Sequence, residues 1–169
     1  GSTVKDRIAG SLAMAAYARE VAKNYDVTIA LHTDHCAKQN LDSWTEQLMH
    51  MEAEEVKAGR LPWFQSHMWD GSAIPLDENL EIAKRLLQLA VDSHTVLEIE
   101  VGAVGGEEDG VVGEINEKLY TSTADAIKTV EALGLGEKGR YITALTFGNV
   151  HGAYKPGHVK LRPELLGTI

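Results

Sequence analysis

The feature that most constrains the fold of this chain is a repeated alternation of short apolar runs with longer amphipathic stretches. The short runs are rich in β-branched and aliphatic residues, as buried strands are. The longer stretches place alanine and leucine at three- and four-residue spacing, as helices do. Parallel strands need a crossover of this length, usually a helix, so the alternation predicts a parallel α/β sheet. The expected elements are helix 4–23, strand Val27–Thr33, helix Leu41–Ala58, strand Trp63–Trp69, helix Asp77–Val91, strand Thr95–Val101, a helix from Thr121 or Ser122 to Leu133, and strand Tyr141–Phe147.

Some local details follow from the same reading. Asp42 or Ser43 is expected to cap the second helix, and Gly59 to stop it. In the third strand, Glu98 and Glu100 alternate with aliphatic residues, which places both carboxylates on one face. The segment 102–117 is rich in glycine and carboxylates and is expected to be an irregular, solvated loop.

All four predicted strands end in polar residues or glycine. The four strand ends are His32-Thr33-Asp34-His35, Asp70, Gly102 and Asn149-Val150-His151. A (β/α)8 barrel gathers its chemistry at the carboxyl ends of its strands, so the pattern favours a partial barrel with about four β/α units. A doubly wound sheet produces the same alternation and remains the alternative.

Histidine and carboxylate at these strand ends suit a metal ion beside a proton-transfer group. His35 and His151 are candidate metal ligands, and Glu100 or Asp70 would be a third. Asp34 is the best acid–base candidate. Strict strand alternation puts it opposite His35, so both face one site only if the strand has broken at Thr33.

Each of these residues also has a purely structural interpretation. A histidine at a strand end is often just hydrogen-bonded there, and Asp34 could orient a histidine rather than react. Glu107 and Glu108 are either a solvated acidic run or part of a lid that brings a carboxylate onto a substrate. The segment 148–157 could wrap a phosphate or an ion with backbone groups, and Lys155 would add a positive charge.

The charge balance narrows the class of partner. The 169 residues include 25 Asp and Glu against 16 Lys and Arg, for a formal net charge of -9. This balance argues against nonspecific binding to nucleic acid or to anionic membranes. No apolar run approaches the ~20 residues of a membrane span. The one cysteine, Cys36, excludes an intrachain disulfide and favours a reducing, cytoplasmic location.

Several long motifs occur together and in a fixed order along the chain. They are Leu31-His-Thr-Asp-His-Cys36, Phe64-Gln-Ser-His-Met-Trp-Asp70, Leu97-Glu-Ile-Glu-Val-Gly102, Gly105-Gly-Glu-Glu-Asp-Gly110 and Phe147-Gly-Asn-Val-His-Gly-Ala-Tyr-Lys-Pro-Gly157. Read together, they resemble the class II, metal-dependent fructose-bisphosphate aldolases. The resemblance covers nearly the whole chain and implies a (β/α)8 barrel, usually a homodimer, that cleaves fructose 1,6-bisphosphate reversibly to dihydroxyacetone phosphate and glyceraldehyde 3-phosphate.

The resemblance also implies roles for individual residues. His35 and His151 correspond to catalytic zinc ligands, and Asp34 to the group that exchanges a proton with the C4 hydroxyl. Glu108 corresponds to the residue that moves the proton on the dihydroxyacetone phosphate carbon. The other implied positions are Glu100 and Asp70 near an alternative metal site, Glu107 as a neighbour in the loop, Val150 and Gly152 as backbone ligands of a monovalent cation (Na⁺ or K⁺) beside the phosphate, and Gly152 and Lys155 as phosphate contacts.

The chain departs from the family pattern at both ends. The third zinc histidine, in a His-Gly-Gly-Ser-Gly stretch, is expected beyond Ile169, and the first two barrel strands before Gly1. Residues 1–169 are therefore expected to be a truncated barrel domain that carries strands three to six of eight. We expect this segment alone to be inactive, to bind zinc weakly and to expose apolar sheet edges. The alternatives are a tagatose-bisphosphate aldolase with the same metal chemistry, or a non-catalytic fragment.

Overall fold

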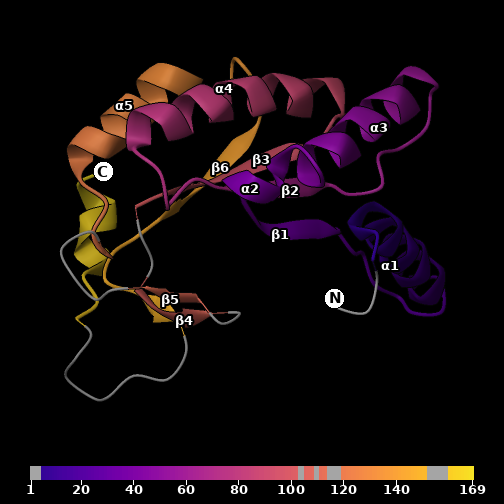
Figure 1. Cartoon of the computed structure of the whole chain (residues 1–169), viewed down its shortest axis with the longest axis horizontal. Coiled ribbons are helices and arrows are strands. Elements are labelled where there is room, and N and C mark those ends of the chain that lie inside the picture. The colour runs from indigo at the N-terminus through magenta and orange to yellow at the C-terminus, as the bar shows by residue number, and fades with distance from the viewer. Residues whose placement is uncertain (1–4, 103–104, 109–110, 114–118, 152–159) are drawn as a thin grey trace.

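The computed structural model describes residues 5–102, 105–108, 111–113, 119–151 and 160–169, with only the backbone for residues 105–108, 111–113 and 151. Its centre is a four-stranded parallel sheet in the order β1-β2-β3-β6 (Figure 1). The elements in chain order are α1 (Arg7–Ala22), β1 (His32–Ala37), α2 (Lys38–Leu41), α3 (Thr45–Lys57), β2 (Ser66–Asp70), α4 (Leu76–Asp92), β3 (Val96–Val101), β4 (Gly105–Glu108), β5 (Val111–Gly113), α5 (Thr123–Leu133), β6 (Tyr141–Leu145), β7 (Val150–His151) and the 3₁₀ helix η2 (Pro163–Gly167).

The strand order decides between the two predicted architectures. Each strand of the four-stranded sheet pairs with the next such strand along the chain, without the reversal of order that defines a doubly wound sheet. Figure 1 shows α3, α4 and α5 over the same face of that sheet. A sheet with sequential parallel strands and helices on one face is the repeating arrangement of a (β/α)8 barrel. The predicted α/β class and partial barrel are therefore confirmed.

The hydrophobic core lies between the sheet and its helices. The largest cluster joins the inward faces of α4 and β3 with residues of β1, β2, α3 and α5; Trp69, Leu86, Leu97 and Ile99 are all fully buried in it. A smaller cluster joins α1 to α3 through Ala15, Leu48 and Phe64. The other face of the sheet carries the polar residues that the strand alternation predicted.

The first strand is displaced from its predicted position. The apolar run from Val27 to Leu31 is not a strand, and β1 begins at His32, where Ser66 of β2 first pairs with it. Val27 and Ile29 are exposed, because no strand lies beside them in the described part of the chain. Strand formation requires a ladder partner, and the sequence alone could not show where that partner begins.

The predicted helix Leu41–Ala58 is also wrong in its first part. The chain forms the short helix α2, a turn, and then α3, whose N-cap is Trp44 rather than Asp42 or Ser43. Trp44 packs against both hydrophobic clusters, and its indole donates to Ser11 of α1 at 2.9 Å. This tertiary contact accompanies a non-helical backbone at Trp44, with φ -140° and ψ -87°.

The segment expected to be irregular contains regular structure. β4 and β5 pair antiparallel, and β7 adds to β4 in parallel, so the three form a second small sheet. The other predicted elements agree with the structure to within a few residues. Ser122 caps α5 through a reciprocal pair of hydrogen bonds with Asp125.

No helix in the described ranges has both the length and the apolar character that crossing a membrane would require.

Candidate metal centre and active site

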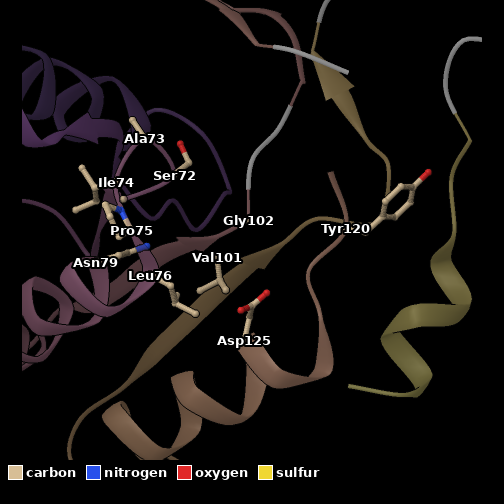
Figure 2. Close-up of a pocket in the computed structure, with 11 residues that line it drawn as sticks. Ser72, Ala73, Ile74, Pro75, Leu76, Asn79, Val101, Gly102, Tyr120 and Asp125 are labelled. Carbon is tan, nitrogen blue, oxygen red and sulfur yellow. The ribbon is translucent and has the colours of Figure 1, made fainter. Parts of the chain in front are cut away.

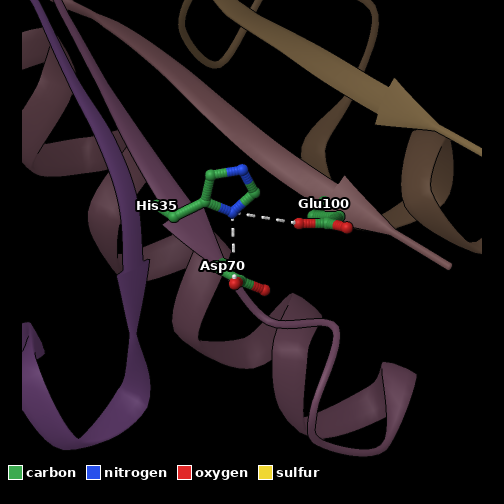
Figure 3. Close-up of side chains that lie close together, drawn as sticks. All are labelled: His35, Asp70 and Glu100. Carbon is green, nitrogen blue, oxygen red and sulfur yellow. Dashed lines mark hydrogen bonds and ion pairs between the residues drawn. The ribbon is translucent and has the colours of Figure 1, made fainter. Parts of the chain in front are cut away.

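Three of the predicted site residues meet at the carboxyl ends of three adjacent strands. His35 lies in β1, Asp70 ends β2, and Glu100 lies near the end of β3. His35 Nδ1 lies 3.3 Å from Asp70 Oδ2 and 3.6 Å from Glu100 Oε2 (Figure 3). One ligand atom from each residue lies within 4.8 Å of the other two. Parallel strands bring their ends to one edge of a sheet, so three residues 30 to 65 positions apart in sequence converge here.

An irregularity in β1 puts Asp34 on the same side as His35. Thr33 pairs with His67 and Cys36 pairs with Trp69, so three steps along β1 match two steps along β2. The extra residue is a bulge. Thr33 and Cys36 both point into the core, and Asp34 and His35 both lie outside it. The strand has not ended at Thr33, as the sequence reasoning required, but the bulge has the same effect on the two side chains.

Asp34 is placed to act beside the cluster rather than within it. Its side chain is 76% exposed, and Oδ1 lies 3.9 Å from Nε2 of His35 and 3.9 Å from Nε2 of His32. Those distances are too long for hydrogen bonds, so Asp34 does not orient His35. That role belongs to Asp70. An exposed carboxylate next to a histidine cluster remains available to exchange a proton with a bound molecule.

The charges in the cluster are mutually stabilising. Burial by itself lowers the pKa of His35, but the hydrogen bond to Asp70 and the charges of Glu100 and Asp34 outweigh it, and the pKa is raised. Burial raises the pKa of Asp70, but hydrogen bonds from the Ser72 hydroxyl and amide and from His35 outweigh it, and the pKa is lowered. The cluster therefore favours a positive charge between two carboxylates.

Further polar contacts lie on the same face nearer the amino ends of the strands, and the sequence reasoning did not predict them. His32 Nδ1 lies 2.8 Å from the Ser66 hydroxyl, and its Nε2 lies 3.5 Å from Glu98. The regular alternation of His32 with the buried Thr33, and of Glu98 with Ile99, was the available signal.

The end of β3 turns sharply after the cluster. Gly102 has φ +114°, and a Cβ there would lie 2.3 Å from Thr146 Oγ1, so both the conformation and the space require glycine. The Thr121 hydroxyl fixes the end of β3 by donating a hydrogen bond of 2.6 Å to the Val101 carbonyl. These contacts fix where the chain leaves β3, after Val101 and one residue beyond Glu100.

A cleft of about 540 Å³ borders the cluster without containing it. Figure 2 shows the β2–α4 loop, Ser72 to Pro75, with Leu76 of α4 on one side and Tyr120 and Asp125 on another. Gly71 and Val101, which directly follow Asp70 and Glu100, also line it. The predicted chemistry lies at the cluster and not in this cleft.

Apart from Val150, the remaining predicted site residues fall wholly or partly outside the described residues. For Glu107, Glu108 and His151 only the backbone is described; it pairs Gly106 of β4 with His151 of β7. Val150 is half-buried in β7. Gly152 and Lys155 lie outside the described ranges. Their predicted roles stay predictions.

The chain matches known proteins along nearly its whole length. The sequence model of the family described as fructose-bisphosphate aldolase class-II matches residues 2–169. Proteins named fructose-bisphosphate aldolase from Mycobacterium tuberculosis and Streptomyces coelicolor are 58% and 59% identical over 166 residues, which is 98% of this chain and 48% of each relative. The chain thus spans about half the length of the curated relatives it matches.

A solved structure gives the same result for the fold. The crystal structure of a fructose-bisphosphate aldolase from Campylobacter jejuni superposes with a TM-score of 0.77 at 38% sequence identity. The match covers 99% of this chain and 47% of that one.

Proposed function

Since the chain belongs to the class II fructose-bisphosphate aldolase family, we propose that it supplies the central part of an enzyme that reversibly cleaves fructose 1,6-bisphosphate to dihydroxyacetone phosphate and glyceraldehyde 3-phosphate. The observation that carries the proposal is the convergence of His35, Asp70 and Glu100 at the carboxyl ends of three adjacent strands, with Asp34 beside them. In our proposal β1, β2, β3 and β6 are strands three to six of an eight-stranded barrel domain.

The family is in general zinc-dependent, and the donor set here fits zinc. An imidazole and two carboxylates, one of them almost fully buried, are ligand types that zinc accepts at catalytic sites. In the proposed enzyme His35 binds the ion with His151, and Asp70 and Glu100 offer an alternative position for it. When bound, zinc supplies Lewis-acid polarisation of the substrate ketone.

In the proposed reaction, carboxylates of this chain transfer the protons, and other residues bind the substrate. Asp34 takes the role that the family resemblance implies and exchanges a proton with the C4 hydroxyl; its exposed carboxylate at the edge of the cluster supports this role. Glu108, with Glu107 as its neighbour, moves the proton on the dihydroxyacetone phosphate carbon. Gly152 and Lys155 contact a substrate phosphate, and the Val150 and Gly152 carbonyls bind a monovalent cation. A homodimer in the cytoplasm completes the proposal.

The proposal has two levels of test. Calorimetric titration of the 169-residue chain with Zn²⁺ should show one weak site that His35→Ala removes. For activity, the 166 residues that align with the Mycobacterium tuberculosis relative would replace the matching segment of that protein, and the chimera would be assayed for cleavage of fructose and tagatose 1,6-bisphosphates. We expect chelator-sensitive cleavage with preference for fructose 1,6-bisphosphate. In the chimera, Asp34→Asn should lower kcat on the order of 10²-fold or more, as for loss of a general acid–base group.

A matched control is Asp42→Asn, an exposed carboxylate in the turn between α2 and α3. It should leave the cleavage rate of the chimera unchanged. A chimera that folds, binds zinc and still fails to cleave either sugar would refute the proposed function.

A further inference from the structure

A buried asparagine connects the two strands that carry the acidic residues of the cluster. Asn79 lies in the first turns of α4, behind the sheet, and only 2% of its surface is exposed. Its Oδ1 accepts a hydrogen bond of 2.7 Å from the indole of Trp69, and its Nδ2 donates to the Glu100 carbonyl at 2.8 Å. One side chain thus joins the end of β2 to the end of β3.

The two residues that Asn79 bonds, Trp69 and Glu100, are directly connected to the metal cluster. Trp69 directly precedes Asp70, and Glu100 is itself a member of the cluster. The registered pairs between β2 and β3 run from Ser66–Val96 to Trp69–Ile99. Next to the last pair, Asn79 supplies a cross-link at the level where the two carboxylates converge on His35.

The neighbouring backbone is shaped around this amide. A Cβ on Gly71 would lie 2.2 Å from both Cγ and Oδ1 of Asn79 and 2.4 Å from its Nδ2. Gly71 has no positive φ, so the close approach of the amide, and not the backbone conformation, is what excludes a side chain. The turn that follows Asp70 is therefore packed directly onto Asn79. Figure 2 shows Asn79 beside Pro75, in the loop that continues this turn.

We propose that Asn79 is a positioning residue for the metal site: it fixes the separation of Asp70 and Glu100 by bridging Trp69 and the Glu100 backbone. It touches none of the reacting groups and acts only through the two strands. The effect of Asn79 on metal binding rests on the proposed function. The effect of Asn79 on the positions of the ends of β2 and β3 does not.

The test compares Co²⁺ binding by the unsubstituted 169-residue chain and by its Asn79→Leu variant. Binding is measured by calorimetry and by visible absorption. Leucine keeps the branched shape of asparagine, although its methyl groups are larger than the amide atoms, and it removes both hydrogen bonds. Because partners that orient metal ligands typically contribute 10–100-fold to metal affinity, we expect a loss of about tenfold with the stoichiometry unchanged. The matched control is Leu87→Ala, on the same helix and in the same core but away from the strand ends. It should melt earlier and still bind Co²⁺ within twofold of the unsubstituted chain.

Gly71→Ala provides an independent perturbation. It leaves Asn79 in place but displaces its amide, so it should reproduce the loss of affinity. In the double variant Gly71→Ala/Asn79→Ala the added methyl group meets no amide, and the affinity should equal that of Asn79→Ala alone. If Asn79→Leu does not fold, Asn79→Ser, which retains a small polar group, takes its place.

The outcomes separate this inference from the proposed function. Affinity for Co²⁺ within twofold of the unsubstituted chain in Asn79→Leu, or an equal loss in Leu87→Ala, overturns the positioning role. If the unsubstituted chain binds no Co²⁺, the proposed metal site fails instead. Amide NMR shifts without metal then decide the inference: it stands if Asn79→Leu displaces the signals of residues 70–72 and 100–102 while Leu87→Ala does not, and it falls if they are unmoved.

Discussion

The buried pair Glu52–His67 gives the sharpest test of how the sheet is held together. Both side chains are fully buried, Glu52 in α3 and His67 in β2. Glu52 Oε1 accepts from the Phe64 amide at 2.8 Å, and Oε2 lies 2.7 Å from His67 Nε2. The other ring nitrogen lies 2.7 Å from the Thr33 hydroxyl, which connects the pair to β1 at the start of its bulge.

The perturbation is Glu52→Leu, which removes the acceptor and leaves the Phe64 amide and one nitrogen of His67 buried without a partner. Each orphaned group costs about 1–3 kcal/mol, and Glu52→Leu leaves two such groups buried. We therefore expect the free energy of unfolding to fall by about 3–5 kcal/mol, a large fraction of the roughly 5–15 kcal/mol of an ordinary domain. In Glu52→Gln the amide still offers an acceptor to Phe64 and a donor to the ring, so the loss should be about 1–2 kcal/mol.

The assay is urea unfolding of the 169-residue chain, followed by circular dichroism. Glu54→Leu is the control, because Glu54 lies on the same helix with its side chain 71% exposed and should change stability by no more than about 0.5 kcal/mol. The double variant Glu52→Leu/His67→Leu should lose less than the sum of the two single losses, since it removes the orphaned ring as well. A loss below about 1 kcal/mol in Glu52→Leu would refute the reasoning from buried hydrogen bonds.

Three further predictions concern other parts of the chain. The pKa of His35 is raised in the folded chain, so its contribution to stability is complete below the unfolded pKa of ~6.5 and disappears as the pH rises through the folded pKa. The pKa of Asp70 is lowered, so its contribution is present above the unfolded pKa of ~3.9 and is lost as the pH falls through the folded pKa. The urea midpoint of the metal-free chain should therefore exceed that of His35→Gln most near pH ~5 and approach it in alkali, and a pH-independent difference would contradict this. Ser122→Ala removes the N-cap bond of 3.1 Å in α5 and should cost about 1 kcal/mol in urea unfolding, with little effect from Ser43→Ala as the control. Cys36 is fully buried and burial raises its pKa, so Ellman's reagent should label it only after urea unfolds the chain; rapid labelling of the native chain would show that the core is open.

The agreement between sequence and structure was best where a local pattern carries its own physical reason. Glu98 and Glu100 alternate with buried aliphatic residues because successive side chains of a strand point to opposite faces. Ser122 caps α5 because its hydroxyl satisfies a free amide at the helix start, and this bond is local in sequence.

Other features left a signal in the sequence, but its meaning depended on a hydrogen-bonding partner far away along the chain. Asn79 and Glu52 each stand on the apolar face of a helix, at three- or four-residue spacing from buried leucine or alanine. A polar residue in that position predicts a buried hydrogen bond. It does not reveal which strand supplies the other half, so the sequence could not identify Asn79 as a bridge or Glu52 as the partner of His67.

The sequence by itself determined the order of the four strands of the parallel sheet and of the main helices between them, the faces of β3, and the residues near the carboxyl ends of these strands. Only the tertiary structure decided that β1 begins at His32, that a bulge turns Asp34 and His35 to one side, and that Trp44 divides a helix in two. The reason is physical. Periodicity and capping are properties of neighbours along the chain, whereas a strand's start, a bulge or a buried bridge depends on which distant segment lies alongside.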